Sequence, residues 1–314
     1  MTRHFLRDDD LSPAEQAEVL DLAARLKRDR FALSPLRGPQ TVALIMDKPT
    51  LRTQTSFSVG VADLQGSPFL VDGTKAQIGT RESVPDVARI IGRQVAAIVW
   101  RTFAQTDLET MAEYAGVPVV NALTDEFHPC QILADLLTVR EHKGGTEGLT
   151  LSFFGDGASN MAHSYLLGGV TAGMHVRIAA PAGYLPEKAI VADAEAIAAG
   201  TGGSVLVTED AAEAARDADV MITDTWVSMG KESEKAERVA VFGGYTVDAE
   251  LMSRAKPDAV FLHCLPAYRG LEVSADVLDG PQSVIWDEAE NRLHAQKAVL
   301  AWLLEKNVTE GSAA

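Results

Sequence analysis

Short apolar runs alternate with amphipathic segments along nearly the whole chain. The apolar runs span about five or six residues between Gly, Pro and Asp, which is typical of buried strands. The segments between them repeat apolar residues at helical spacing, which predicts helices. The expected strands cover residues 41–46, 67–72, 96–100, 117–122, 149–155, 175–180, 204–208, 219–224, 259–264 and 283–288. The expected helices cover residues 13–27, 50–64, 83–93, 107–115, 129–142, 160–172, 186–199 and 288–305.

This alternation predicts parallel sheets with helices on both faces. The chain has 314 residues, more than one hydrophobic core usually supports. A stretch rich in Gly and polar residues at 142–148 interrupts the pattern and marks a boundary. We therefore expect an α/β fold with two doubly wound parallel-sheet domains joined by helices. The expected bounds are residues 1–142 and 143–287, with a C-terminal helix in residues 288–314 that returns to the first domain.

The charge and the cysteine content restrict the possible partners and compartment. A net charge of −16 argues against a nucleic acid or an anionic membrane as partner, although a local basic pocket could still bind a small anion. No apolar run approaches the length of a membrane span. The two cysteines, Cys130 and Cys264, form no disulfide framework and fit a reducing compartment. The first residues lack the apolar core of a signal peptide, so we expect a cytoplasmic protein.

The loop after the first strand carries two hydroxyls and a guanidinium at the start of a helix, in Thr50-Leu51-Arg52-Thr53. Ligands of doubly wound sheets bind at the carboxyl ends of strands. A helix N-terminus attracts anions, and these side chains add donors suited to phosphate. The alternative is an ordinary N-cap by Thr50 beside a solvated arginine.

Three further features in similar places strengthen the phosphate hypothesis. Arg101 follows a buried strand, and His128 and Gln131 lie three apart at the start of a helix. Arg292 falls in the first turn of the last helix. A surface arginine and a capping pair are the alternatives for the first two features. Taken together, the arginines at strand ends and helix starts of an acidic protein predict a phosphate pocket.

The second half of the chain suggests a site for a cationic amine. Gly155 and Gly157 resemble part of a dinucleotide fingerprint, but the third glycine and the acidic residue for a ribose are missing, which argues against an NAD oxidoreductase. Asp224 and Cys264 each end an expected strand, and Asn160 opens an expected helix. The alternative for Cys264 is a buried core thiol.

Taken in order, five motifs resemble those of ornithine carbamoyltransferases, in the aspartate/ornithine carbamoyltransferase family. They are Thr50-Leu51-Arg52-Thr53, Trp100-Arg101-Thr102, His128-Pro129-Cys130-Gln131, Asp224 followed by Ser228-Met229-Gly230, and His263-Cys264-Leu265-Pro266. The resemblance covers residues 3–305. It implies transfer of a carbamoyl group from carbamoyl phosphate to the δ-amine of L-ornithine, giving citrulline and phosphate in arginine biosynthesis. It also implies no metal or organic cofactor, and a homotrimer or a multiple of trimers.

The resemblance also implies roles for individual residues. The catalytic residues would be Arg101, His128, Asp224 and Cys264. Carbamoyl phosphate would be bound by Thr50, Leu51, Arg52, Thr53, Arg101, His128, Gln131, Cys264, Leu265 and Arg292, and by Gln77 from a loop that reaches a neighbouring subunit's site. Ornithine would be bound by Asn160, Asp224, Ser228 and Met229.

The chain departs from the usual motifs mainly on the phosphate side. The family's Ser-Thr-Arg-Thr-Arg is replaced so that Leu51 and Gln54 stand where a hydroxyl and a guanidinium are usual. Tyr268 replaces a histidine, and Thr80 displaces a loop arginine by one position. One alternative is therefore a specialised paralogue with a different amine acceptor, or one tolerant of a phosphate-mimicking inhibitor. Another is a non-catalytic amine or phosphate binder that kept the fold.

Overall fold

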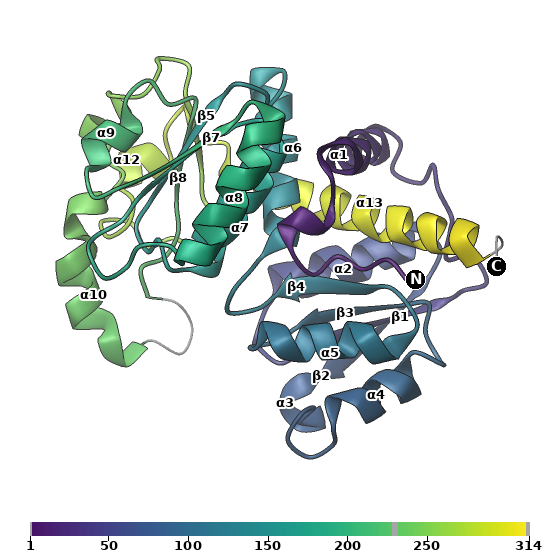
Figure 1. Cartoon of the computed structure of the whole chain (residues 1–314). Coiled ribbons are helices and arrows are strands. Elements are labelled where there is room, and N and C mark those ends of the chain that lie inside the picture. Colours follow the sequence, from purple (N-terminus) through teal and green to yellow (C-terminus); the bar gives the residue numbers. More distant parts are fainter. Residues whose placement is uncertain (1, 228–231, 312–314) are drawn as a thin grey trace. The chain divides into compact units, whose positions relative to one another are not determined.

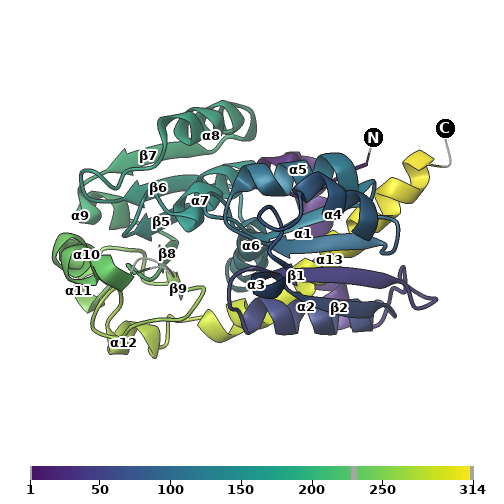
Figure 2. The ribbon, with the colours of Figure 1, turned by 90° about the horizontal axis from the view of Figure 1, so that it is seen from below.

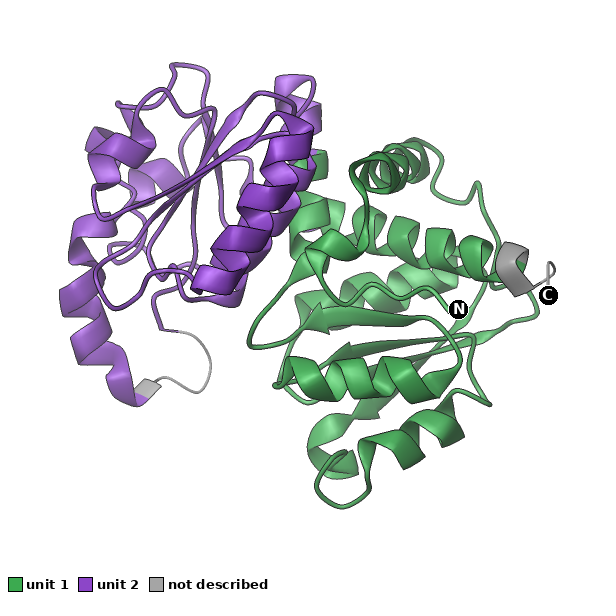
Figure 3. Ribbon diagram, in the orientation of Figure 1, with its two compact units in different colours: residues 1–137, 290–314 green, residues 138–289 purple. Residues whose placement is uncertain are grey.

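The computed structural model describes residues 2–227 and 232–311. The chain divides into two compact units, which Figure 3 shows in different colours. Unit 1 comprises residues 1–137 and 290–314, and unit 2 comprises residues 138–289. Each unit is built on its own parallel sheet, so the expected pair of parallel-sheet α/β domains is confirmed.

The sheet of unit 1 has the strand order β2-β1-β3-β4, and all its pairs are parallel. Its strands are β1 (Thr41–Met46), β2 (Ser67–Asp72), β3 (Ala97–Arg101) and β4 (Val119–Leu123). Its helices are α1 (Pro13–Arg28), α2 (Arg52–Asp63), α3 (Gly73–Ala76), α4 (Val84–Ile91), α5 (Gln105–Ala115), most of α6 (Pro129–Lys143) and most of α13 (Ile285–Gly311). Helices α2 and α13 cover one face of the sheet, and α4 and α5 cover the other (Figure 1). The two central strands are therefore apolar on both faces, which explains their continuous hydrophobic runs.

Helix α13 is fixed to the rest of unit 1 by polar contacts as well as by apolar packing. Lys297 Nζ donates to Asp63 Oδ2 over 3.2 Å and to the Arg30 carbonyl over 2.8 Å. Trp302 Nε1 donates to Glu18 on α1 over 3.0 Å. These contacts confirm that the C-terminal helix returns to the N-terminal domain.

The sheet of unit 2 has the strand order β7-β6-β5-β8-β9, again all parallel. Its strands are β5 (Thr150–Phe154), β6 (His175–Ala179), β7 (Ser204–Thr208), β8 (Val220–Thr223) and β9 (Val260–Leu262). Its helices are α7 (Asn160–Thr171), α8 (Lys188–Thr201), α9 (Ala211–Ala215), α10 (Lys235–Phe242), α11 (Ala249–Met252) and α12 (Ala275–Leu278). Helices α7 and α8 lie on one face, and α9 to α12 lie on the other (Figures 1 and 2).

The expected strand at residues 283–288 is wrong. Ser283 makes a single bridge to Phe261, and helix α13 begins at Ile285. The apolar residues do not form a buried run, because Trp286 is 68% exposed. Asp287 and Glu288 lie in the first helical turn, where acidic side chains interact favourably with the helix dipole.

None of the helices within residues 2–227 and 232–311 is both long enough and apolar enough to cross a membrane.

Candidate active site

Both sheets reverse their strand order at one point, and several of the sequence motifs lie there. In unit 1 the reversal is between β1 and β3, whose following loops carry residues 47–51 and 102–104. In unit 2 it is between β5 and β8, which are followed by residues 155–159 and by Asp224. Ligands of doubly wound sheets bind at such switch points. Each unit therefore presents its own candidate half-site.

Thr53 lies at the centre of the half-site in unit 1. Its side chain is buried in the first turn of α2, and its Oγ1 accepts hydrogen bonds from Arg292 Nη2 over 3.2 Å and from Arg101 Nη1 over 3.5 Å. Arg292 also donates through Nη1 to Gln131 Oε1. Residues from β3 and α13 thus meet at a hydroxyl of α2, and Gln131 of α6 holds the residue from α13. Arg101 is buried, so the surface alternative for this residue is wrong.

His128 is buried beside these arginines. Burial, followed by the positive charges of Arg292, Arg101, Lys48 and Arg52, holds the pKa of His128 well below its usual value. The imidazole is therefore neutral at physiological pH. A group of cations around a neutral ring is an environment that favours an anionic ligand.

Lys48 belongs to this half-site, although the sequence analysis did not single it out. It is buried, forms an ion pair with Asp125, and lies 4.6 Å from the centre of the Phe103 ring. Burial lowers the pKa of its ammonium group. The signal that could have found it is a charged residue two positions after a buried strand, immediately before the Pro49-Thr50 turn.

The other residues of unit 1 that are expected to bind phosphate are more exposed than this buried cluster. The N-cap of α2 is Leu51, which makes no side-chain cap and is 77% exposed, so Thr50 is not the N-cap. Arg52 is exposed on the next position. Gln77 is exposed after α3 with a left-handed backbone, and its hydrogen bonds stay within its own loop.

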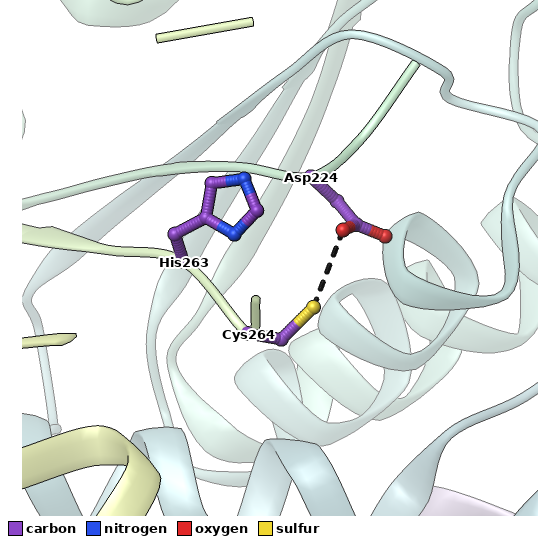
Figure 4. Close-up of side chains that lie close together, drawn as sticks. All are labelled: Asp224, His263 and Cys264. Atoms are coloured by element: carbon purple, nitrogen blue, oxygen red, sulfur yellow. Dashed lines mark hydrogen bonds between the residues drawn. The ribbon is translucent and has the colours of Figure 1, made fainter. Parts of the chain in front are cut away.

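In unit 2, the thiol of Cys264 donates to Asp224 Oδ1 over 3.2 Å (Figure 4). Burial raises the pKa of Asp224, while the nearby His263, the Thr225 N–H and this thiol act in the opposite direction. Asn160 is the first residue of α7, whose N-cap Ser159 accepts from the Ala162 N–H. The structure therefore joins Asp224 and Cys264 directly, so the thiol is not merely packed in the core.

His263 holds the loop that contains Cys264 and Leu265. Its Nδ1 accepts from the Leu265 N–H over 2.9 Å, and the backbone N–H of His263 donates to Glu288 Oε2 over 2.8 Å. Its Nε2 faces the buried Glu272 Oε1 at 3.5 Å. Leu265 has a φ of 58° and a cis bond to Pro266. The sequence analysis missed Glu272 and Glu288. Neither residue is part of the motif at residues 263–266, and no local pattern in the sequence connects them to it.

Asp224, His263 and Cys264 offer three ligand atoms within 4.8 Å of one another. An oxygen, a nitrogen and a sulfur are donors that Zn²⁺ accepts. However, both ring nitrogens of His263 already face protein groups. Within the trio, the Cys264 thiol already donates to Asp224.

Arg238 links the two loops of the unit 2 half-site. Its guanidinium donates through Nη2 to Asp156 and through Nε to the Trp226 carbonyl, and it lies 5.3 Å from the Tyr184 ring and 5.2 Å from the Phe242 ring. Asp156 lies in the loop before α7 and Trp226 follows Asp224 by two positions. This buried contact fixes the spacing between the loops of Asn160 and Asp224. The expected ligands Ser228 and Met229 lie outside the described residues.

The departures from the family motifs lie at accessible positions. Tyr268 is 49% exposed and donates its backbone N–H to Glu272. Gln54 is half-buried in the first turn of α2. Thr80 and Arg81 are exposed in the loop after α3. None of these four residues therefore sits in the buried cluster around Thr53.

The fold defines a class of two-domain α/β proteins, in which each unit carries a candidate half-site at the switch point of its own sheet. The sequence model of the aspartate/ornithine carbamoyltransferase carbamoyl-P binding domain matches residues 3–141. That of the Asp/Orn binding domain matches residues 147–303. The chain belongs to the aspartate/ornithine carbamoyltransferase family.

Individual relatives agree with this assignment. The ornithine carbamoyltransferase of Leifsonia xyli subsp. xyli is 70% identical over 307 residues, which cover 98% of each chain. The crystal structure of ornithine carbamoyltransferase from Gloeobacter violaceus is 44% identical with a TM-score of 0.88, covering 97% of this chain and 99% of that one. The ornithine carbamoyltransferase from Pyrococcus furiosus is 43% identical with a TM-score of 0.91, covering 95% and 96%.

Proposed function

We propose that this chain transfers the carbamoyl group of carbamoyl phosphate to the δ-amine of L-ornithine, giving L-citrulline and phosphate. The observation that carries the proposal is the convergence of Arg101 and Arg292 on Thr53 beside the neutral His128. The relatives named ornithine carbamoyltransferase support the same reaction. They give no support to the alternative of a paralogue with a different acceptor or with inhibitor tolerance.

Unit 1 binds carbamoyl phosphate in this proposal. The start of α2, with Thr50, Leu51, Arg52 and Thr53, holds the phosphate through backbone N–H groups, hydroxyls and a guanidinium. Arg101 and Arg292 neutralise the charge that develops on the carbamoyl oxygen and on the leaving phosphate. Because His128 is neutral, it can donate a hydrogen bond to the carbamoyl oxygen without giving up a full proton. Gln131 fixes Arg292 and holds the carbamoyl amide.

Unit 2 binds ornithine and prepares its amine. Asn160, Ser228 and Met229 hold the amino acid, and Asp224 receives the δ-ammonium. A raised pKa makes the Asp224 carboxylate a stronger base, which suits it to accept the proton that the amine must lose before it attacks. The amine nitrogen then bonds to the carbamoyl carbon, and the bond from that carbon to the phosphate oxygen breaks. Cys264 and Leu265 line the place of reaction. No metal or organic cofactor takes part.

The proposed assembly is a homotrimer or a multiple of trimers. Strand β2 is an edge of its sheet, and its Phe69 and Leu70 are 57% and 48% exposed. An exposed apolar edge strand is typical of a surface that a partner covers. The exposed Gln77 follows this strand, so a second copy on this edge lies within reach of its loop. The proposed setting is the cytoplasm and arginine biosynthesis, which fits the two free cysteines.

The test is citrulline formation by the purified chain, with ornithine, lysine and putrescine compared as acceptors and carbamoyl phosphate varied. We expect ornithine to exceed putrescine in kcat/KM by at least about a hundredfold, because putrescine lacks the α-carboxyl group and leaves polar groups of the site unpaired. Lysine keeps both α-groups and is one methylene longer, so we expect a smaller preference of about ten- to two-hundredfold over lysine. Turnover with another amine at a higher kcat/KM would overturn the proposal. Binding of both substrates without any citrulline would favour the non-catalytic alternative.

A further inference from the structure

Gln296 is fully buried on α13, one turn after Arg292, and it contacts Arg292 on one side and Ser56 on the other. The hydroxyl of Ser56 has a single proton, and the Arg52 carbonyl accepts it over 2.8 Å. Ser56 Oγ must then accept from the amide nitrogen of Gln296. The amide oxygen consequently faces Arg292, at 2.9 Å from Nε and 2.7 Å from Nη2.

We infer that Gln296 is a positioning residue for the carbamoyl phosphate half-site, an inference that rests on the proposed function. The guanidinium of Arg292 is planar, so acceptors on two of its edges fix its orientation. Gln296 accepts on the edge formed by Nε and Nη2, while Gln131 accepts from Nη1. Gln296 thereby determines which way the remaining donor surface of Arg292 points, although Gln296 itself contacts no substrate.

The same amide connects Arg292 to the phosphate loop. Ser56 lies one turn after Arg52 and bonds to the Arg52 carbonyl and, over 3.2 Å, to the Thr53 carbonyl. A change at Gln296 therefore affects both the arginine from α13 and the first turn of α2. We therefore expect a change at Gln296 to affect catalysis through the orientation of Arg292 and of the first turn of α2, rather than through the free energy of one lost hydrogen bond.

Gln131 is held in an analogous way on the other side of Arg292. Its Nε2 donates to the buried Asp135 over 2.8 Å, which leaves its Oε1 toward Arg292. Arg292 is therefore held between two amides, and each amide is oriented by a neighbour that accepts from its nitrogen. Such relays orient a group to well within an ångström, and a displacement of about 1 Å in an active site costs up to about a hundredfold in rate.

The test compares Gln296→Leu and Gln296→Glu with the native chain, in steady-state kinetics and in calorimetric binding of phosphonoacetamide. This probe carries a methylene in place of the labile bridging oxygen of carbamoyl phosphate. For Gln296→Leu we expect kcat/KM for carbamoyl phosphate to fall by about ten- to a hundredfold. Its KM for ornithine at saturating donor should change by less than about twofold, because the unit 2 residues are untouched. Gln296→Glu keeps an acceptor for Nε and Nη2 of Arg292, so it should restore part of the loss, although its carboxylate adds negative charge and requires the Ser56 proton to leave the Arg52 carbonyl.

The matched control is Lys297→Met on the next position of the same helix. Lys297 is equally buried but bonds to Asp63 and Arg30, away from Arg292. We expect this variant to lower the melting temperature while leaving the KM for carbamoyl phosphate unchanged. If Gln296→Leu behaves like Lys297→Met, with a lower melting temperature and native affinity for phosphonoacetamide, the positioning role is overturned. If the native chain makes no citrulline, the proposed function fails, and the phosphonoacetamide affinities still decide the role of Gln296.

Discussion

The hydroxyl of Thr53 accepts a hydrogen bond from Arg292 over 3.2 Å, although 239 positions separate the two residues in the sequence. Arg101 donates to the same oxygen over 3.5 Å. The proposed donor site is therefore organised around one small side chain at the start of α2.

Replacing Thr53 with Val removes the shared acceptor and keeps the shape of the side chain. We expect kcat/KM for carbamoyl phosphate to fall by about ten- to a hundredfold, because two guanidiniums lose the group that aligns them. The KM for ornithine should change little. Thr55→Val, at an exposed position two residues later, is the control and should be close to native. Equal kinetics of the two variants would contradict a central role for Thr53.

Restoring the usual family residues in the phosphate loop tests whether the departures matter. We expect the double variant Leu51→Thr, Gln54→Arg to lower the KM for carbamoyl phosphate by roughly three- to tenfold, since one charge-assisted hydrogen bond contributes about 1.5–3 kcal/mol at best and both positions are partly solvated. Because charge-assisted contacts to exposed groups weaken in salt, the gain should shrink as ionic strength rises. Tyr268→His in the same background is a control on the other unit. A KM that does not change would identify the altered loop as neutral variation.

Arg238 should affect the ornithine half-site through the loops that it connects. Replacing it with Met leaves the buried Asp156 without its charged partner, a change that typically costs about 3–5 kcal/mol of stability. We also expect the KM for ornithine to rise by about tenfold or more, while the affinity for phosphonoacetamide stays native. Arg254→Met, which breaks an exposed ion pair with Glu250 in the same unit, should do neither. Unchanged kinetics for ornithine in a folded Arg238→Met protein would refute the linking role.

We expect Asp224 to lower the free energy of unfolding of the native chain and to be required for citrulline formation. Burial raises its pKa in the folded chain above the unfolded value, so ionised Asp224 opposes folding increasingly as the pH rises through the folded pKa. Asp224→Asn removes this cost, and we expect it to stabilise the protein at pH 7.5 by on the order of 1 kcal/mol and to have little effect at about pH 2, where both states are protonated.

The same variant should lose about a hundred- to ten-thousandfold in kcat, because the amine loses its proton acceptor. Thermal unfolding at several pH values and citrulline formation measure the two effects. The measured quantity is the free energy of unfolding of Asp224→Asn minus that of the native chain. If this difference is smaller at pH 7.5 than at low pH, the assigned direction of the pKa shift is contradicted.

The sequence predicted the elements that depend on local patterns. Strands such as residues 41–46 and 204–208 were placed to the residue, because continuous apolar runs between turn residues leave few other structures. The failure at 283–288 arose where apolar and β-branched residues open a long helix, since a short apolar run does not distinguish a strand from a helix. The short helices α9, α11 and α12 were missed because four or five residues carry no measurable periodicity.

The candidate site residues that the sequence analysis found also depend on local patterns, whereas those that it missed do not. Arg101, His128 and Cys264 were found because each follows or precedes a strong strand or helix signal. Gln296, Arg238 and Glu272 were missed, because each acts through a partner far away in the sequence. In the sequence, these polar and charged residues on helices or loops cannot be distinguished from ordinary surface residues. Only the folded structure shows that these side chains are buried.

The dependence of unit 1 on α13 has a consequence for how the protein forms on the ribosome. Asp63 is synthesised 234 positions before Lys297, the buried cation that pairs with it in addition to Arg30. At elongation rates of about 5–20 residues per second, that interval lasts roughly ten to fifty seconds. Until α13 has been made, the strands of unit 1 lack Arg292 and Lys297, which the finished fold places beside Thr53 and Asp63. In the proposed function, the donor site is therefore complete only once the last helix has been synthesised.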